Sequence, residues 1–182
     1  MKILVLLSPG FEETEAISVI DVLRRAKLDV TTASLLPNQT VLGSHQIPVV
    51  ADLSLNDVLK DDPMAYDSIV LPGGMRGVEN MLNDAHVPEL VRQFHAESKV
   101  VAAVCAAPLI LEKAGILEGH SFTCHPCIFD TIRAEGRLER PAVTDKNIVT
   151  GRSAGCALAW AIELTKKLVG SDDSIRAGLA IL

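Results

Sequence analysis

Residues 99–108 read Lys-Val-Val-Ala-Ala-Val-Cys-Ala-Ala-Pro, and they predict a buried strand, a tight elbow and the start of a helix. The apolar run 100–104 suits a strand that is covered on both faces. Pro108 suits the first turn of a helix, where its missing N–H is not needed. Because a strand that leads directly into a helix is part of a β–α unit, this stretch favours an α/β fold and places Cys105 on the elbow.

The same alternation of short apolar runs and helical stretches extends through the chain in both directions. It predicts a mostly parallel, doubly wound sheet with helices on both faces. The segment 40–50, with its glycine and proline, is typical of a minor hairpin. No repeat or flexible linker interrupts the pattern, so we predict one domain over residues 1–182. The predicted strands are 2–7, 29–35, 67–71, 99–104 and 147–150; the predicted helices are 13–26, 76–97 with a break at Pro88, 107–114 and 154–168.

The composition excludes several classes of protein. The 182 residues include 17 Lys and Arg against 23 Asp and Glu, a net charge of −6, and they carry few aromatic side chains. A nucleic-acid-binding surface is therefore disfavoured. The longest uncharged apolar run, residues 100–111, is too short to span a bilayer, and residues 1–7 lack the apolar core of a signal peptide. We accordingly expect a cytoplasmic protein whose four cysteines are free thiols.

The reactive groups of such sheets gather at the carboxyl ends of the strands, which here precede the loops 8–15, 72–78, 105–108 and 151–155. The helix that follows Cys105 would stabilise its thiolate, making the sulfur both nucleophilic and oxidisable. Cys105 could equally be a small, inert core residue.

The pair Gly73 and Gly74 ends a strand and lets backbone amides approach a bound anion. The amides of Gly74 and Ala106 are candidates for an oxyanion hole, although a turn needs glycine for steric reasons alone.

Glu15 continues the apolar stripe of the first predicted helix, since helical steps lead from it to Val19, Val22 and Ala26. A carboxyl group on this inward face would be desolvated and partly protonated, and could donate a hydrogen bond to a thiolate or oxyanion. The alternative is an acidic residue that only complements the helix dipole.

The motif Cys124-His125-Pro126-Cys127 allows three interpretations. The two cysteines could form a dithiol redox pair, or His125 could serve as a base or orienting group for Cys105. A zinc site is the least favoured, because no second Cys/His cluster lies at the spacing of a zinc finger. The other histidines, at 45, 86, 95 and 120, are expected to face solvent.

Four segments together resemble the ThiJ/PfpI superfamily, in the branch of the Parkinson disease protein seven deglycase. They are Ser-Pro-Gly-Phe-Glu-Glu-Thr-Glu-Ala at 8–16, Val-Leu-Pro-Gly-Gly at 70–74, Ala-Ala-Val-Cys-Ala-Ala-Pro at 102–108 and Thr-Gly-Arg-Ser-Ala-Gly at 150–155. The resemblance implies a flavodoxin-like fold, no cofactor and no metal, and a homodimer packed through the first helix. It also implies that Cys105 is the reactive cysteine, that Glu15 hydrogen-bonds to it and that His125 lies nearby.

The resemblance implies a cysteine enzyme that acts on reactive dicarbonyls such as methylglyoxal, or on their early adducts, including glycated proteins. Peptidase activity is disfavoured, because protease-like relatives carry a histidine directly after the cysteine, where this chain has Ala106. The alternative function is a redox-responsive stress protein or chaperone, signalled by oxidation of Cys105 to the sulfinic acid. A dithiol oxidoreductase at Cys124 and Cys127 is the third possibility.

Overall fold

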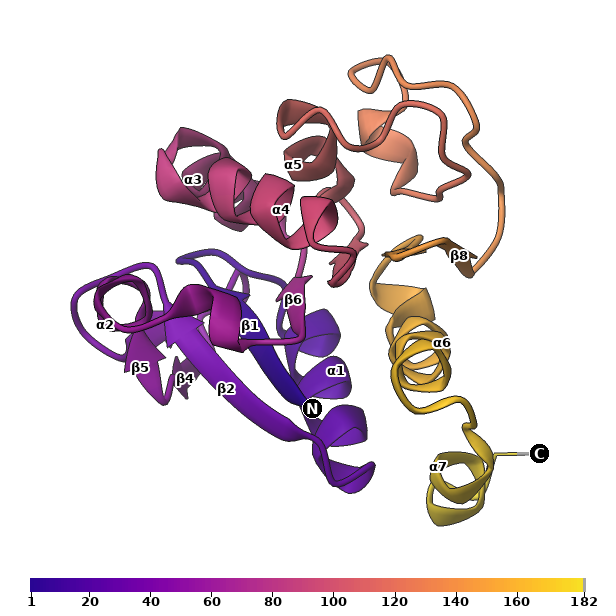
Figure 1. Ribbon diagram of the computed structural model, residues 1–182, viewed down its shortest axis with the longest axis horizontal. Helices are drawn as coiled ribbons and strands as arrows, with labels where there is room; N and C mark the ends of the chain where they lie inside the picture. Colours follow the sequence, from indigo (N-terminus) through magenta and orange to yellow (C-terminus); the bar gives the residue numbers. More distant parts are fainter. Residues whose placement is uncertain (182) are drawn as a thin grey trace.

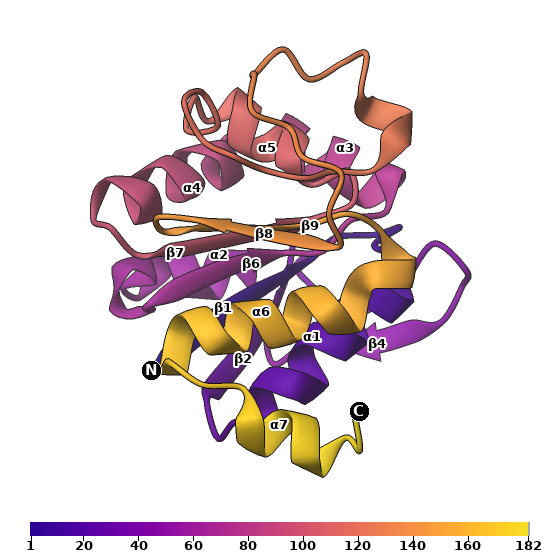
Figure 2. The ribbon, with the colours of Figure 1, turned by 90° about the vertical axis from the view of Figure 1, so that its right-hand side faces the viewer.

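The computed structural model describes residues 1–181, which form a central sheet with helices on both faces (Figures 1 and 2). The sheet has seven strands in the order β5-β2-β1-β6-β7-β9-β8, and every neighbouring pair is parallel except β8 with β9. Two further strands pair into a separate antiparallel hairpin. The strands are β1 (Lys2–Leu7), β2 (Asp29–Ser34), β3 (Thr40–Leu42), β4 (Pro48–Val50), β5 (Leu53–Ser54), β6 (Ser68–Leu71), β7 (Val100–Val104), β8 (Ala142–Asp145) and β9 (Ile148–Gly151).

The helices divide between the two faces, as the edge-on view in Figure 2 shows. The helices α2 to α5 cover one face, and α1, α6 and α7 cover the other. The α-helices are α1 (Glu13–Arg25), α2 (Leu55–Lys60), α3 (Met75–Asn83), α4 (His86–Ala96), α5 (Pro108–Lys113), α6 (Ala157–Val169) and α7 (Asp173–Gly178). Three short 3-10 helices lie at Pro63–Ala65, Pro126–Ile128 and Ala154–Cys156. Among the described residues, no helix is long and apolar enough to cross a membrane.

Strand side chains alternate between two separate apolar cores. In β1, Leu4 and Leu6 pack under α2 to α5, whereas Ile3, Val5 and Leu7 pack against α1 and α6. This alternation follows from the two-residue period of a strand, and it explains why the central strands read as continuous apolar runs. The predicted α/β class and flavodoxin-like arrangement are confirmed.

Two local predictions were wrong. The long helical stretch 76–97 is indeed interrupted, but the break lies at Asp84 and Ala85 rather than at Pro88. Pro88 is the third residue of α4, and proline is tolerated in a first turn because that N–H has no partner within the helix. His120 is buried instead of facing solvent, and its ring packs edge to face against His95 with the ring centres 5.6 Å apart.

The fold brings four loops to one edge of the sheet. They follow β1, β6, β7 and β9, which are consecutive hydrogen-bonded neighbours in the order β1-β6-β7-β9. The fourth loop begins after Gly151, whose carbonyl accepts a 3.0 Å hydrogen bond from the Cys105 amide. The predicted meeting point of the four loops is therefore present.

Candidate active site

Cys105 lies on the sharp turn between β7 and α5. Its backbone φ is +63°, in the left-handed region that residues with a Cβ rarely adopt. The turn is closed by the Ala107 amide, which donates to the Val104 carbonyl at 2.9 Å, and Pro108 then begins α5. The Cys105 side chain is half-buried. An unfavourable backbone angle at a partly accessible cysteine is the kind of strain that is found at functional sites.

Glu15 projects from α1 into the protein and is fully buried. Its Oε2 accepts a 2.8 Å hydrogen bond from the Gly73 amide, whereas its Oε1 has no partner among the described residues. Burial raises the pKa of Glu15 to about 7, and the hydrogen bonds from the Cys105 thiol and the Gly73 amide oppose this increase only in part. Near neutral pH the carboxyl group therefore exchanges readily between its neutral and charged forms.

Burial also raises the pKa of the Cys105 thiol, and the adjacent Glu15 carboxyl raises it further. Hydrogen bonds from the amides of Gly74 and Ala106 act in the opposite direction. The pKa of the Cys105 thiol is therefore raised, whereas the helix N-terminus alone was expected to lower it. Because the two groups are in contact, they titrate as a pair. One negative charge, placed on either the carboxyl or the sulfur, is much easier to hold here than two.

The two glycines before α3 are required for different reasons. Gly74 has a φ of +88°, so this position favours glycine for its backbone conformation. A Cβ on Gly73 would lie 2.6 Å from both the Cys105 Cβ and the Glu15 Oε2. Gly73 therefore lets the β6 loop approach the cysteine and the glutamate closely, and this approach directs its amide onto the carboxyl group.

His125 is placed beside Cys105 by the backbone. Its amide donates to the Cys105 carbonyl at 2.8 Å, while its ring Nδ1 accepts from the Cys127 amide at 3.1 Å. A neutral imidazole that accepts at Nδ1 carries its proton on Nε2. In this tautomer His125 is a hydrogen-bond donor through Nε2, which favours the orienting role over that of a base.

The two cysteines around His125 have different surroundings. Cys124 is buried, and burial raises the pKa of its thiol to about 11, whereas Cys127 is exposed. A mostly protonated, buried thiol is a poor partner for thiol–disulfide exchange. These surroundings weigh against the dithiol interpretation.

Glu13 anchors the β3–β4 hairpin to α1, a role that the sequence did not indicate. Its carboxylate accepts hydrogen bonds from the Ser44 hydroxyl at 2.9 Å, from the His45 amide at 2.6 Å and from the His45 ring at 3.0 Å. Burial alone would raise the pKa of Glu13, but these hydrogen bonds lower it to about 2. Glu12, Glu13 and His45 form the one group of side chains at metal-ligand spacing among residues 1–181. The Glu13 oxygens of this group already accept hydrogen bonds from the hairpin.

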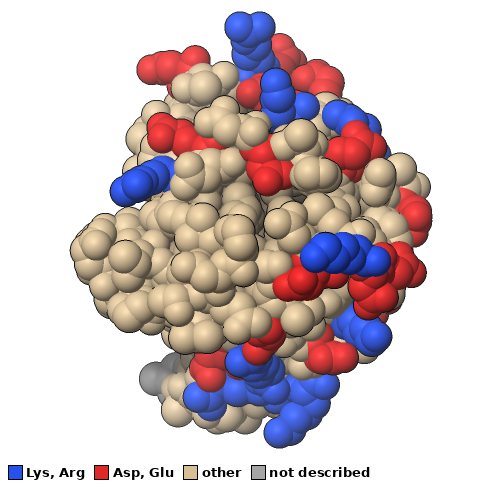
Figure 3. Space-filling view, turned by 90° about the vertical axis from the view of Figure 1, so that its left-hand side faces the viewer, with Lys and Arg blue, Asp and Glu red and all other residues tan. Residues whose placement is uncertain are grey.

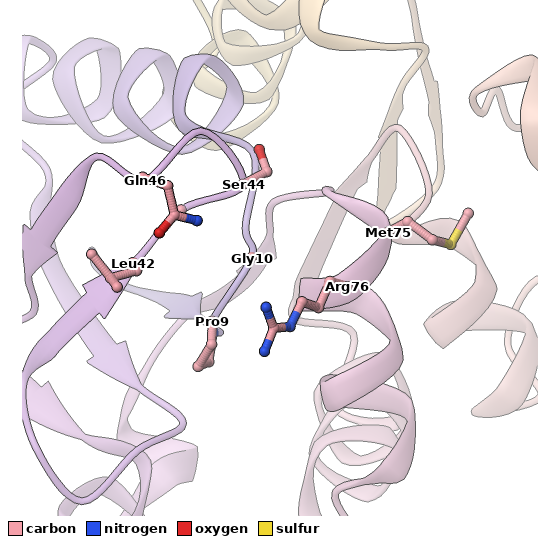
Figure 4. Close-up of a pocket in the computed structure, with 8 residues that line it drawn as sticks. Pro9, Gly10, Leu42, Ser44, Gln46, Met75 and Arg76 are labelled. Atoms are coloured by element: carbon pink, nitrogen blue, oxygen red, sulfur yellow. The ribbon is translucent and has the colours of Figure 1, made fainter.

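A cavity of about 370 Å³ lies next to the cysteine site, between the hairpin and the start of α3 (Figure 4). Arg76 and Gln46 lie on opposite sides of it, and the loop through Gly10 runs between them. This cavity could not be predicted from the sequence, because nothing in the local pattern places the hairpin beside α3. Neither Cys105 nor Glu15 lines it, but Gly74, whose amide reaches the sulfur, is only two residues before Arg76.

Comparisons with known proteins agree with this architecture. The model of the DJ-1/PfpI family matches residues 1–167. "Protein DJ-1 homolog B" of Arabidopsis thaliana is 32% identical over the whole chain, which spans about two fifths (41%) of that longer protein. "Deglycase TK1284" of Thermococcus kodakarensis is 32% identical over 92% of this chain and 99% of its own.

Among solved structures, Drosophila melanogaster DJ-1beta superposes with a TM-score of 0.93 at 34% identity, covering 100% of this chain and 98% of its own. The family match covers most of the chain, and the fold agrees over its full length. The chain therefore belongs to the DJ-1/PfpI family.

Proposed function

We propose that this protein is a cofactor-independent cysteine enzyme that converts reactive dicarbonyls, or their early adducts on amines and thiols, into hydroxy acids. The observation that carries the proposal is the contact between the strained Cys105 and the buried Glu15, with two backbone amides directed at the sulfur. The 32% identity to a protein named deglycase supports the same class of reaction.

The first step joins Cys105 to the aldehyde carbon of methylglyoxal. The sulfur attacks, the carbonyl electrons move to oxygen, and the thiol proton passes to the Glu15 carboxylate. The amides of Gly74 and Ala106, which reach the sulfur, would stabilise the new oxyanion until it is protonated. The product of this step is a hemithioacetal.

The second step moves hydrogen between the two substrate carbons. Glu15, with a pKa of about 7, is suited both to remove the proton from the first carbon and to return it to the second. The ring N–H of His125 can donate to the substrate oxygen during this transfer. The resulting thioester is hydrolysed by water, which releases lactate and regenerates the thiol, so one water is consumed and no external oxidant is needed.

Lactate formation from methylglyoxal by the metal-free protein tests this proposal. We expect turnover by the wild type and by Cys127→Ser, which removes an exposed thiol outside the reacting pair. Cys105→Ser should reduce turnover by at least 100-fold, in line with the loss of a covalent nucleophile. Equal turnover by wild type and Cys105→Ser would eliminate the proposal.

A redox function is the second candidate, because the same sulfur is partly accessible and contacts a proton donor. A protonated Glu15 could donate to a sulfinate oxygen and favour that oxidation state. Intact-mass measurement after mild peroxide should then show an increase of about 32 Da, the mass of two oxygen atoms on the sulfur. Glu15→Gln should reduce the yield. An unmodified Cys105 would end this alternative.

We further propose a homodimer in which a second copy covers α1 and the β3–β4 hairpin. Residues 35–51 contain no Asp, Glu, Lys or Arg, and Figure 3 shows an uncharged lobe on this side of the molecule. Exposed apolar side chains lie on both elements, with Ile17 at 47%, Ile47 at 54% and Val50 at 68% exposure. Contiguous apolar surface of this kind marks protein interfaces. Light scattering should show a dimer that Ile47→Lys converts to monomer and that Val169→Lys, on the exposed side of α6, does not.

A further inference from the structure

Arg76 is a cation without a partner at the edge of the cavity described above. Among the described residues its guanidinium makes no ion pair and no side-chain hydrogen bond, although other arginines do. Arginine offers five N–H donors in a fixed planar arrangement that matches a carboxylate or phosphate. The free donors of Arg76 are therefore available to an anionic ligand.

The surroundings of Arg76 favour an anion on the hairpin side. The hairpin that forms the opposite wall belongs to the uncharged segment 35–51, and in Figure 4 the Gln46 amide and the Arg76 guanidinium are directed toward the space between them. Behind this wall, the Glu13 carboxylate already accepts hydrogen bonds from Ser44 and His45. Asp84 lines a second cavity on the other side of Arg76, where its Oδ1 accepts from the start of α4.

Two glycines let the backbone pack closely in the wall of this cavity. Gly10 has a φ of +83°, and a Cβ there would lie 2.8 Å from the Arg76 Cβ. At Gly43 a Cβ would lie 2.3 Å from the Glu13 Oε1. Both positions therefore depend on glycine, and both line the cavity. Its volume, about 370 Å³, is in the range of pockets that hold small organic ligands.

The cavity is close enough to the cysteine site to share one substrate with it. The Gly74 amide reaches the Cys105 sulfur, and Arg76 follows after a single residue. Since consecutive Cα atoms are about 3.8 Å apart, the Cα atoms of Gly74 and Arg76 are separated by less than about 8 Å. Cys105 itself does not line the cavity, so a substrate that uses both must carry its anionic group several atoms from the carbon that reacts at the sulfur.

We propose that the cavity between Arg76 and Gln46 binds the carboxylate of a substrate whose carbonyl end reacts at Cys105. The inference rests on the proposed function for the reaction, and it narrows the substrate class to dicarbonyl adducts of amino acids or peptides with a free carboxylate. Because the whole protein carries a net charge of −6, it offers no general attraction for an anion, and binding there depends on the local cation.

The reaction of such an adduct balances without an added oxidant. In the hemithioacetal of methylglyoxal with a cysteine derivative, Glu15 moves a proton from the first carbon to the second, which gives a lactoyl thioester. Cys105 then attacks the thioester carbonyl, and the cysteine derivative leaves as its thiol. Water cleaves the remaining thioester to lactate and restores Cys105.

The kinetic test compares two hemithioacetals of methylglyoxal that differ in one charge, formed with N-acetylcysteine and with N-acetylcysteine amide. We expect wild-type kcat/KM to be about tenfold higher for the carboxylate, the effect of one charge-assisted hydrogen bond. Arg76→Gln should reduce this ratio to about one, and Arg76→Lys should retain part of it. Lys113→Gln, which removes one positive charge from an exposed side chain at the end of α5, should keep the tenfold ratio. A ratio that Arg76→Gln leaves unchanged would overturn the inference.

A binding test separates this inference from the proposed function. The stable thioether S-acetonyl-N-acetylcysteine and its amide are titrated calorimetrically into Cys105→Ser protein, with and without Arg76→Gln. Tenfold tighter binding of the carboxylate thioether, lost with Arg76→Gln, supports the subsite. If the wild-type protein then turns over neither hemithioacetal, only the proposed function fails. Equal affinities for the thioether and its amide would refute the subsite.

Discussion

Replacing Glu15 with glutamine should make the protein's stability depend less on pH. The carboxyl group is fully buried, and its pKa is raised from 4.5 to about 7 in the folded state. The folded protein therefore binds this proton more tightly than the unfolded chain does. The resulting stabilisation is fully present below pH 4.5 and is lost as the pH rises through 7. Glutamine, which does not titrate, removes this contribution at every pH.

The size of the effect follows from the shift in pKa. Each unit corresponds to about 1.4 kcal/mol, so the whole shift is worth roughly 3 kcal/mol, of which about 2.5 kcal/mol falls between pH 5 and pH 8. Relative to wild type, Glu15→Gln should thus be about 2.5 kcal/mol more stable at pH 8 than at pH 5. The other titrating groups are common to the two proteins, and their contributions cancel in the comparison. Cys105 is coupled to Glu15, but burial raises the pKa of its thiol in both proteins, so it stays protonated between pH 5 and pH 8.

Urea unfolding followed by circular dichroism at several pH values measures this difference directly. Glu79→Gln, which removes an exposed carboxylate from α3, serves as the matched control and should leave the pH profile parallel to that of wild type. Parallel profiles for Glu15→Gln and wild type between pH 5 and pH 8 would refute the reasoning, because they would show that the buried carboxyl does not take up a proton in this range.

Three further outcomes test the surroundings of the site. Gly73→Ala places a Cβ 2.6 Å from both Cys105 and Glu15, so thermal unfolding should show a loss of about 1–3 kcal/mol; wild-type stability would contradict the close approach. Cys105→Gly should be about 1 kcal/mol more stable than Cys105→Ala in urea, since glycine adopts a φ of +63° without strain; equal midpoints would mean that the elbow relaxes. Glu13→Ala should speed amide exchange over residues 43–47 at least tenfold while leaving β1 protected, and an unchanged rate would show that other contacts hold the hairpin.

Much of the architecture, and the separate positions of Cys105 and Glu15, could be predicted from local patterns, whereas their contact was implied by the family resemblance. The apolar runs of β1, β6 and β7 mark strands that are buried on both faces, and Pro108 indicates the elbow at Cys105. The helical stripe through Val19 and Val22 placed Glu15 on the buried face of α1. These predictions succeeded because each depends on residues that are neighbours along the chain.

The features that escaped prediction depend on contacts between distant segments. The strand β8 is only four residues long and partly exposed, and it exists because it pairs with β9. The pKa of the Cys105 thiol depends partly on the Glu15 carboxyl, which lies on another helix. The cavity beside Arg76 forms only when the hairpin folds against Gly10 and α3. None of these contacts leaves a periodic signal in the sequence.

The order of the sheet has a consequence for redesign. The groups that meet at the sulfur are fixed by β1, β6 and β7, which are held in register by their own ladder hydrogen bonds. The hairpin 40–50 and the segment 121–141 lie outside this frame, one beside the Arg76 cavity and the other beside the Cys105 carbonyl. If the proposed function holds, exchanging these two peripheral segments between family members, with the hairpin contacts to Glu13 kept, should change which molecules bind while Cys105 and Glu15 stay in contact.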